Sequence, residues 1–223
     1  MVSSLSRQQP TLAAELALWQ TGYRRVAGLD EAGRGAWAGP VVAAAVILPP
    51  DPAVADRLAG VADSKQLSAR QRARLFDQIV QQAAAWAVGM VPAAQIDAHG
   101  IVAATHCAMH AALAGLSLAP DYLLIDYLRL SELATPQHSL PKGDSRVLSI
   151  AAASIVAKVS RDRWMAGLEM QHPGYGFQQH KGYGTAAHRA ALRQLGPCAQ
   201  HRMTFQPLQD TQLALPAGEP DHG

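Results

Sequence analysis

Two adjacent carboxylates stand out because the sequence around them is otherwise apolar. Asp30 and Glu31 lie between the apolar stretches 26–29 and 41–48, and a Gly-Arg-Gly turn follows at 33–35. Two like charges beside a buried strand raise each other's pKa and destabilise the fold, so folding alone does not explain the pair. A divalent cation such as Mg²⁺ or Mn²⁺ would reverse that effect, because it binds carboxylate oxygens. The pair therefore indicates a metal site, and a hairpin turn with incidental charges is the alternative.

Two further carboxylates, Asp126 and Asp144, are expected near the edge of a sheet. Asp126 ends the apolar run 122–126, and Asp144 lies in a loop before an alanine-rich helix. Ligands of open α/β sheets bind at the carboxyl ends of the strands, so all four acidic side chains can gather at one edge. Several carboxylates holding two divalent ions about 3.5–4 Å apart are the usual arrangement for cutting phosphodiester bonds. The pattern predicts a metal-dependent hydrolase.

Spacing alone leaves the membership of this site open. Asp162 competes with Asp144, although its position four residues after Lys158 is more simply that of an ion pair on a helix surface. His106 and His110 have the i, i+4 spacing of some zinc sites, but no third ligand is evident. Ordinary helix positions explain these two histidines more simply.

The Gly33-Arg34-Gly35 turn offers a backbone without bulky side chains beside the acidic pair. Such a turn can approach a sugar closely, and hydrogen bonds to a 2′-hydroxyl distinguish RNA from DNA. Tyr183, which lies between two glycines, can stack on a sugar or a base, and packing explains it equally well.

Strands and helices must alternate to position these residues. Apolar patterns predict strands at 25–30, 41–48, 86–90 and 122–126, and helices at 12–19, 101–116 and 149–169. A capping box at Ser68 and Gln71 predicts a further helix through about residue 83, and Thr185 can cap one that ends at 195. Residues 127–143 are expected to be irregular, and Asp97 is expected at a helix start. The order predicts an α/β domain that opens with a hairpin.

Composition is that of an ordinary globular protein with 49% hydrophobic and 16% charged residues. No apolar run is long enough to span a membrane and no secretory signal is evident, so we expect no membrane contact. Cys107 and Cys198 suggest no disulfide framework and fit a reducing cytoplasm. Residues 145–205 carry eight Lys or Arg and only two acidic residues. A basic segment beside an acidic site predicts a polyanionic substrate, with a solvated helix face as the alternative.

Together, the motifs resemble the signature of the ribonuclease HII family, the type 2 ribonucleases H. The resemblance begins with Asp30-Glu31-Ala-Gly-Arg-Gly and Ala38-Gly-Pro-Val-Val-Ala-Ala-Ala-Val. It continues through Asp63-Ser64-Lys65, Leu124-Ile-Asp126, Lys142-Gly-Asp144-Ser, 151–163, His180-Lys181-Gly-Tyr183 and His201-Arg-Met-Thr-Phe205. Several spaced motifs in the right order make the resemblance specific, and it covers about residues 24–207.

The resemblance implies a ribonuclease H-like α/β fold, a mixed sheet flanked by helices, with a small C-terminal helical subdomain. The expected organisation is an N-terminal extension at 1–23, a catalytic domain at 24–170, a basic helical subdomain at 171–210 and a disordered tail at 211–223. We expect a cytoplasmic monomer.

The resemblance also implies an endonuclease that acts in DNA replication and in the removal of ribonucleotides from DNA. Such an enzyme hydrolyses the RNA strand of RNA–DNA hybrids and cuts 5′ of single ribonucleotides in duplex DNA. The products have 5′-phosphate and 3′-hydroxyl ends. The implied ligands of two Mg²⁺ or Mn²⁺ ions are Asp30, Glu31, Asp126 and Asp144, with Asp30 as the bridging ligand. The resemblance thus favours Asp144 over Asp162.

Substrate contacts follow from the same resemblance. It assigns Gly33, Arg34 and Gly35 to the 2′-hydroxyl and Tyr183 to the sugar beside the cleaved junction. Ser64 and Lys65, with Lys158 and Lys181 in the basic region, are expected to contact phosphates.

This chain departs from the family pattern at two places. Gly-Arg-Gly is commonly followed by Pro-Leu, whereas Ala36-Trp37 follows here, and Tyr127-Leu128 replaces the frequent Gly-Asn after Asp126. Neither change removes an acidic residue. A non-catalytic hybrid-binding protein would not need four carboxylates, and a junction resolvase on the same fold would leave the Gly-Arg-Gly turn and Tyr183 unexplained.

Overall fold

A mixed five-stranded sheet forms the centre of the computed structural model, which describes residues 9–208. The strands are β1 (Val26–Ala32), β2 (Val41–Ile47), β3 (Ala85–Val91), β4 (Tyr122–Asp126) and β5 (Gln137–Leu140). Their order across the sheet is β3-β2-β1-β4-β5. β1, β2 and β3 pair antiparallel, whereas β4 is parallel to both β1 and β5. The expected opening hairpin and the mixed sheet are thus confirmed.

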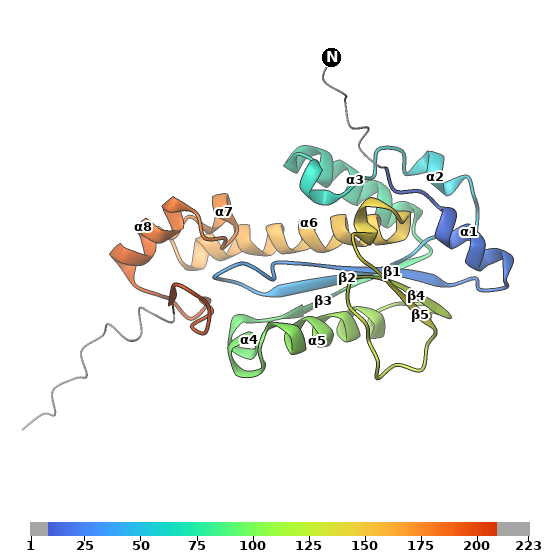
Figure 1. The fold of residues 1–223 in the computed structure, drawn as a ribbon. Coiled ribbons are helices and arrows are strands. Elements are labelled where there is room, and N and C mark those ends of the chain that lie inside the picture. Colours follow the sequence, from blue (N-terminus) through green and yellow to red (C-terminus); the bar gives the residue numbers. More distant parts are fainter. Residues whose placement is uncertain (1–8, 209–223) are drawn as a thin grey trace, which may run out of the picture.

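Helices cover both faces of the sheet. They are α1 (Ala13–Gln20), α2 (Val54–Arg57), α3 (Ala69–Gln82), α4 (Ala93–His99), α5 (Ile101–Ala114), α6 (Leu148–Gln171), α7 (Phe177–His180) and α8 (Ala186–Leu195). Two short 3₁₀ turns, η1 (Ser64–Gln66) and η2 (Gly143–Ser145), precede α3 and α6. Figure 1 shows α6 and α3 on one face, α4 and α5 on the other, and α7 and α8 beyond one end of the sheet.

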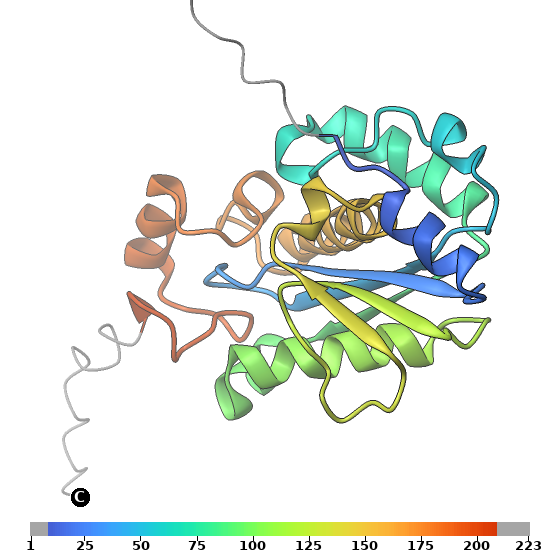
Figure 2. The same ribbon diagram turned by 45° about the vertical axis from the view of Figure 1, so that its right-hand side comes forward.

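Two apolar layers hold this arrangement together. The alanine-rich face of α6 packs with α1 and α3 on one side, and α5 packs on the other side. All seven residues of β2 are buried, as expected for a central strand covered by helices on both faces. Figure 2 shows the same layers from another direction, with the C-terminal helices beside the hairpin end of the sheet.

Local sequence signals explain where two of the helices begin. Ser68 and Gln71 form the expected capping box at the start of α3, where the Ser68 hydroxyl accepts the Gln71 N–H at 3.3 Å. Thr185 caps α8 as expected, because its hydroxyl accepts the His188 N–H at 3.2 Å.

Two expectations about local structure were wrong. Residues 127–143 are not wholly irregular, because Gln137–Leu140 forms the edge strand β5. This strand is short and polar, so it lacks the apolar pattern by which strands are predicted. Asp97 does not start a helix but lies inside α4, where its carboxylate accepts the N–H groups of Met203 and Thr204 at 2.8 and 3.0 Å.

Within residues 9–208, no helix combines the length and apolar character needed to cross a bilayer. The expected tail at 211–223 falls outside the described residues.

Candidate active site

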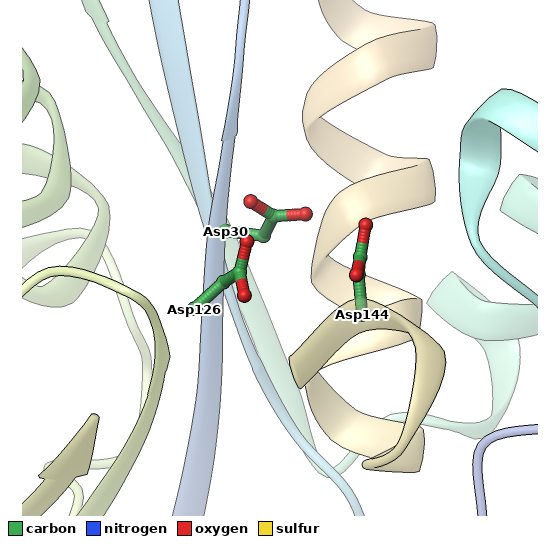
Figure 3. A group of neighbouring side chains, drawn as sticks. All are labelled: Asp30, Asp126 and Asp144. Carbon is green, nitrogen blue, oxygen red and sulfur yellow. The ribbon is translucent and has the colours of Figure 1, made fainter. Parts of the chain in front are cut away.

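Three carboxylates from separate elements meet at one edge of the sheet. Asp30 projects from β1, Asp126 ends β4, and Asp144 lies in η2 before α6. One carboxylate oxygen from each residue lies within 4.8 Å of the other two (Figure 3). Because β1 and β4 are parallel neighbours, their carboxyl ends lie together. In the part of the chain that the structure describes, this is the one group of three such side chains close enough to share a metal ion.

Burial makes this cluster electrostatically unfavourable without a cation. Burial raises the pKa of Asp30 well above its ordinary value, and the negative charges of Glu31 and Asp126 raise it further. The pKa of Asp126 is also raised, mainly by burial, although the N–H of Gly143 donates to its carboxylate at 2.7 Å. Several buried oxygens that repel one another are a donor set suited to a hard divalent ion.

Glu31 lies beside the three aspartates without joining their close group. One of its carboxylate oxygens accepts from Arg34 at 3.3 Å, and the other is buried without a hydrogen-bond partner. Burial raises the pKa of Glu31, and Arg34 opposes that rise. The unpartnered oxygen fits a fourth ligand that a cation would satisfy.

A cavity of about 240 Å³ connects the acidic residues with most of the predicted substrate contacts. Its lining includes Asp30, Glu31, Asp126, Gly33, Arg34, Gly35, Ser64, Lys65, Lys158 and Tyr183. Of the other predicted site residues, Asp144 belongs to the carboxylate group, and Lys181 lines a neighbouring pocket with Asp162 and Arg72. The fold thus brings together residues that are more than 150 positions apart in the sequence.

Basic side chains border the cavity at two points. Lys65 Nζ lies 3.4 Å from a carboxylate oxygen of Asp144. Lys158 Nζ lies 2.7 Å from Asp162 and 5.4 Å from the centroid of the Tyr183 ring. Asp162 therefore forms the predicted i, i+4 ion pair, and it does not belong to the carboxylate group.

Ser154 also lines the cavity, although sequence reasoning did not select it. Its hydroxyl is 2.9 Å from the hydroxyl of Ser64, so it joins α6 to η1 beside the acidic residues. Ser154 was not selected because it lies in an alanine-rich segment, where a small polar residue is readily explained by helix packing.

Two buried arginines that sequence reasoning missed support the Gly-Arg-Gly turn. Arg161 donates to the carbonyls of Pro40, Ala38 and Lys181 at 2.8–3.0 Å. Its side chain also fills the space beside Gly33, where a Cβ would lie 2.0 Å from Arg161 Nε. The backbone of Gly33 has φ +92°, which independently favours glycine. A sequence signal did exist, because Arg161 follows Ala157 of the alanine-rich segment by four residues, which places both on one helix face.

Arg202 holds the other side of the turn. It donates to the carbonyl of Arg34 at 2.8 Å and to that of Gly39 at 2.9 and 3.0 Å. Both Arg161 and Arg202 are fully buried, and burial lowers the pKa of each guanidinium. The N–H groups of both guanidinium groups donate mainly to backbone carbonyls, and these hydrogen bonds hold the backbone around the Gly-Arg-Gly turn in place.

The histidine pair on α5 has a simpler environment. His106 and His110 both contact the exposed Glu132, and they do not belong to a three-residue metal group within the described chain.

Comparison with known protein sequences identifies the family of this chain. The family model described as "Ribonuclease HII" matches residues 27–208. The Ribonuclease HII of Roseiflexus castenholzii is 59% identical over 202 residues, which cover 90% of each chain. That of Chloroflexus aurantiacus is 54% identical over 209 residues, covering 92% of this chain and 98% of the relative.

The fold also matches a solved structure. The ribonuclease H2 from Pyrococcus horikoshii superposes with a TM-score of 0.70 at 26% identity, covering 85% of this chain and 97% of that one. Sequence, fold and the arrangement of acidic residues agree. The chain belongs to the ribonuclease HII family and is a hydrolytic endonuclease of the ribonuclease H type.

Proposed function

We propose that this enzyme cuts the RNA strand of RNA–DNA hybrids and also cuts 5′ of single ribonucleotides embedded in duplex DNA. Products carry 5′-phosphate and 3′-hydroxyl ends. The observation that carries this proposal is one cavity lined by acidic residues, by the Gly33-Arg34-Gly35 turn and by Tyr183. The acidic residues serve the chemistry of hydrolysis, and the turn and the tyrosine serve recognition of the sugar.

Asp30, Asp126 and Asp144 would hold Mg²⁺ or Mn²⁺, with Glu31 as a further ligand and Asp30 shared between two ions. The mutual proximity of the three aspartates, the burial of Asp30 and Asp144 and the unpartnered oxygen of Glu31 fit this role. When bound, the ions would supply Lewis-acid stabilisation of the charge that develops as the phosphodiester is hydrolysed. The role of the carboxylates would be to hold these ions in a fixed position beside the scissile phosphate.

Recognition of the sugar belongs to the turn and to Tyr183. A 2′-hydroxyl seated at 33–35 finds backbone polar groups without side chains in the way, since no atom lies within 4 Å of a Cβ built at Gly35. Tyr183 stacks on the sugar beside the junction. Lys65, Lys158 and Lys181 neutralise neighbouring phosphates, because ammonium groups bind phosphate oxygens without reading sequence. Ser64 offers a neutral hydroxyl to the same backbone.

The whole chain acts, in this proposal, as a cytoplasmic monomer that removes ribonucleotides from DNA. The basic segment 145–205 supports a polyanionic duplex as the substrate.

A labelled DNA duplex with one ribonucleotide tests the proposal. We expect cleavage 5′ of the ribonucleotide with Mg²⁺ or Mn²⁺ and none with chelator, whereas an all-DNA duplex stays intact. An RNA–DNA hybrid should be cut at many positions. Binding without cutting under every condition would favour a non-catalytic hybrid-binding protein. Cutting of four-way DNA junctions but not of the ribonucleotide duplex would favour a resolvase.

Arg34→Ala tests the recognition turn. Loss of this side chain should reduce the preference for the ribonucleotide duplex over all-DNA by about tenfold, the value of one hydrogen bond of ~1.4 kcal/mol. Arg34→Lys is the matched control for the ion pair with Glu31, because it keeps a cation there. Unchanged selectivity in Arg34→Ala would contradict the role of this turn residue.

A further inference from the structure

Trp37 lies just behind the proposed recognition site and joins its two parts through the backbone. It follows the Gly-Arg-Gly turn by two residues and does not line the cavity. Its N–H donates to the carbonyl of Gly182 at 2.8 Å, and its carbonyl accepts the N–H of Arg202 at 2.8 Å. The segment after the turn is therefore held directly against the residue that precedes Tyr183.

The indole of Trp37 occupies the space in which a side chain at position 184 would lie. A Cβ built on Gly184 would be 2.2 Å from Cζ2 of Trp37, and the three nearest atoms all belong to the indole. Gly184 does not have a positive φ, so its backbone would accept any residue. The closest steric conflict at 184 is therefore with the indole. Gly182 differs, because it has φ +79° and its Cβ would meet the carbonyl oxygen of Ala38 at 2.4 Å.

Neighbouring side chains restrain the indole against Gly184. The Trp37 ring lies 5.5 Å from the buried ring of His188, and the Arg189 guanidinium lies 5.3 Å from the Trp37 ring centroid. His188 also contacts the carbonyl of Tyr183 through Nδ1 at 3.0 Å. Trp37 thus touches the residues on both sides of Tyr183 as well as the histidine that holds its backbone.

We propose that Trp37 is a positioning residue whose fit against Gly184 sets the distance between the Gly-Arg-Gly turn and Tyr183. This inference rests on the proposed function, since it takes the turn and Tyr183 as the two parts that read the sugar. The bulk of the indole acts as a spacer, and Gly184 is the complementary residue that lets the Tyr183 loop lie directly on it. The turn can then contact the 2′-hydroxyl while Tyr183 contacts the sugar beside the cleaved junction.

The structure supplies a direct reason why such a spacer affects selectivity. Tyr183 lines the same cavity of about 240 Å³ as Gly33, Arg34 and Gly35. A displacement of about 1 Å in a positioned group can lower a rate by up to about a hundredfold. A methyl group between the indole and the 183–185 loop would cause a shift on that scale, because a Cβ at position 184 would lie only 2.2 Å from the indole and one of the two must move.

The test uses one variant that creates a clash between residue 184 and the indole and a second that removes the indole. Gly184→Ala should lower kcat/KM for the single-ribonucleotide duplex by about tenfold or more, since it moves Tyr183. Trp37→Leu, which keeps an apolar side chain but removes the indole, should lower it only about threefold and leave room for a Cβ at 184. In the double variant, Gly184→Ala should then have no further effect. Gly167→Ala is the control for adding a methyl group, because its Cβ would meet no atom within 4 Å.

A second pair of variants tests whether Gly184→Ala lowers kcat/KM by displacing Tyr183. When Tyr183→Ala is already present, Gly184→Ala should change kcat/KM less than twofold, whereas a merely structural loss would appear in both backgrounds. The inference would be overturned if Gly184→Ala lowered kcat/KM equally in the parent and in Trp37→Leu. It would also be overturned if Gly184→Ala kept full activity. If Gly184→Ala does not fold, a folded and active double variant supports the fit, and an unfolded double variant contradicts it. Tyr183→Ala with unchanged cutting would instead reject the proposed role of Tyr183 itself.

Discussion

At the scale of single residues, Asp30 illustrates the conflict between stability and chemistry. Its carboxylate is only 4% exposed and lies among other negative charges, so the folded chain holds it at an energetic disadvantage. Serine and backbone donors offset this only in part, since the pKa of the group stays well above its ordinary value. Such residues are kept for function rather than for folding.

Replacing Asp30 should therefore affect catalytic activity and folding stability in opposite directions. Asp30→Asn should abolish cutting and, without divalent ions, raise the free energy of unfolding at pH 7 by roughly 1–2 kcal/mol. The sign follows because a carboxyl whose pKa is raised by folding ionises more readily in the unfolded chain, which disfavours the fold at pH 7. Urea unfolding with and without Mn²⁺ measures both effects, and the stabilisation by Mn²⁺ should shrink in the variant.

Asp162→Asn is the matched control for this stability measurement. Asp162 pairs with Lys158 at 2.7 Å, so its loss should lower the free energy of unfolding or leave it unchanged. An Asp30→Asn variant that cuts normally, or that is less stable than the parent without metal, would contradict the assignment.

At the scale of elements, the contact between β1 and α6 controls where the acidic edge lies. A Cβ on Gly28 would be 2.2 Å from the backbone carbon of Ser149, so strand and helix approach each other without side chains between them. Glu15 of α1 strengthens this junction, because its buried carboxylate accepts the Ser149 N–H at 2.7 Å. A carboxylate from a distant helix thus caps the start of α6, whose own N-cap residue, Val147, makes no side-chain cap.

Two glycine substitutions test the importance of this approach. Gly28→Ala should lower the free energy of unfolding by about 1–3 kcal/mol, because the backbone of α6 must move away from β1. Gly167→Ala lies on the exposed part of the same helix and should raise that free energy by about 0.5–1 kcal/mol. Chemical denaturation measures both. If Gly28→Ala were as stable as the parent, the close strand–helix contact would be wrong.

At the scale of the whole molecule, a buried histidine pair organises the C-terminal helices. His188 Nε2 lies 3.0 Å from His201 Nε2, and His201 Nδ1 accepts the Cys198 N–H at 2.9 Å. The His188 ring also stacks on His180 at 4.3 Å between centroids. Burial, with a smaller contribution from neighbouring histidines, lowers the pKa of both His188 and His201 to about 4. The pair is therefore neutral in the folded protein at neutral pH.

This pair should make the folded protein sensitive to mild acid. Between the ordinary value of 6.5 and about 4, the unfolded chain takes up protons that the folded chain does not. Stability should accordingly fall as pH drops through this window, by up to about 3 kcal/mol per histidine. Urea unfolding at pH 7 and pH 4.5 measures the loss, and it should be smaller in the double variant His188→Gln, His201→Gln. An equal loss in both proteins would contradict the role of the pair.

The sequence by itself determined the features that depend on neighbouring residues. The capping box at Ser68 predicted the start of α3, and the apolar run 41–48 predicted β2, because capping and periodicity are local properties. Asp30 and Glu31 were also selected from sequence, since a charged pair between buried strands conflicts with local folding rules. β5 escaped prediction because its stability comes from pairing with β4 and not from its own composition.

Only the tertiary structure decided which distant residues meet. Spacing could not choose between Asp144 and Asp162; the family resemblance favoured Asp144, and the fold brings Asp144 to Asp30 and Asp126 and leaves Glu31 beside their close group. It also buried the guanidinium of Arg202 against the carbonyl of Gly39, 163 residues away, and fitted the indole of Trp37 against Gly184. Such contacts depend on the path of the whole chain and on steric fit within about an ångström, and neither residue type nor spacing encodes these.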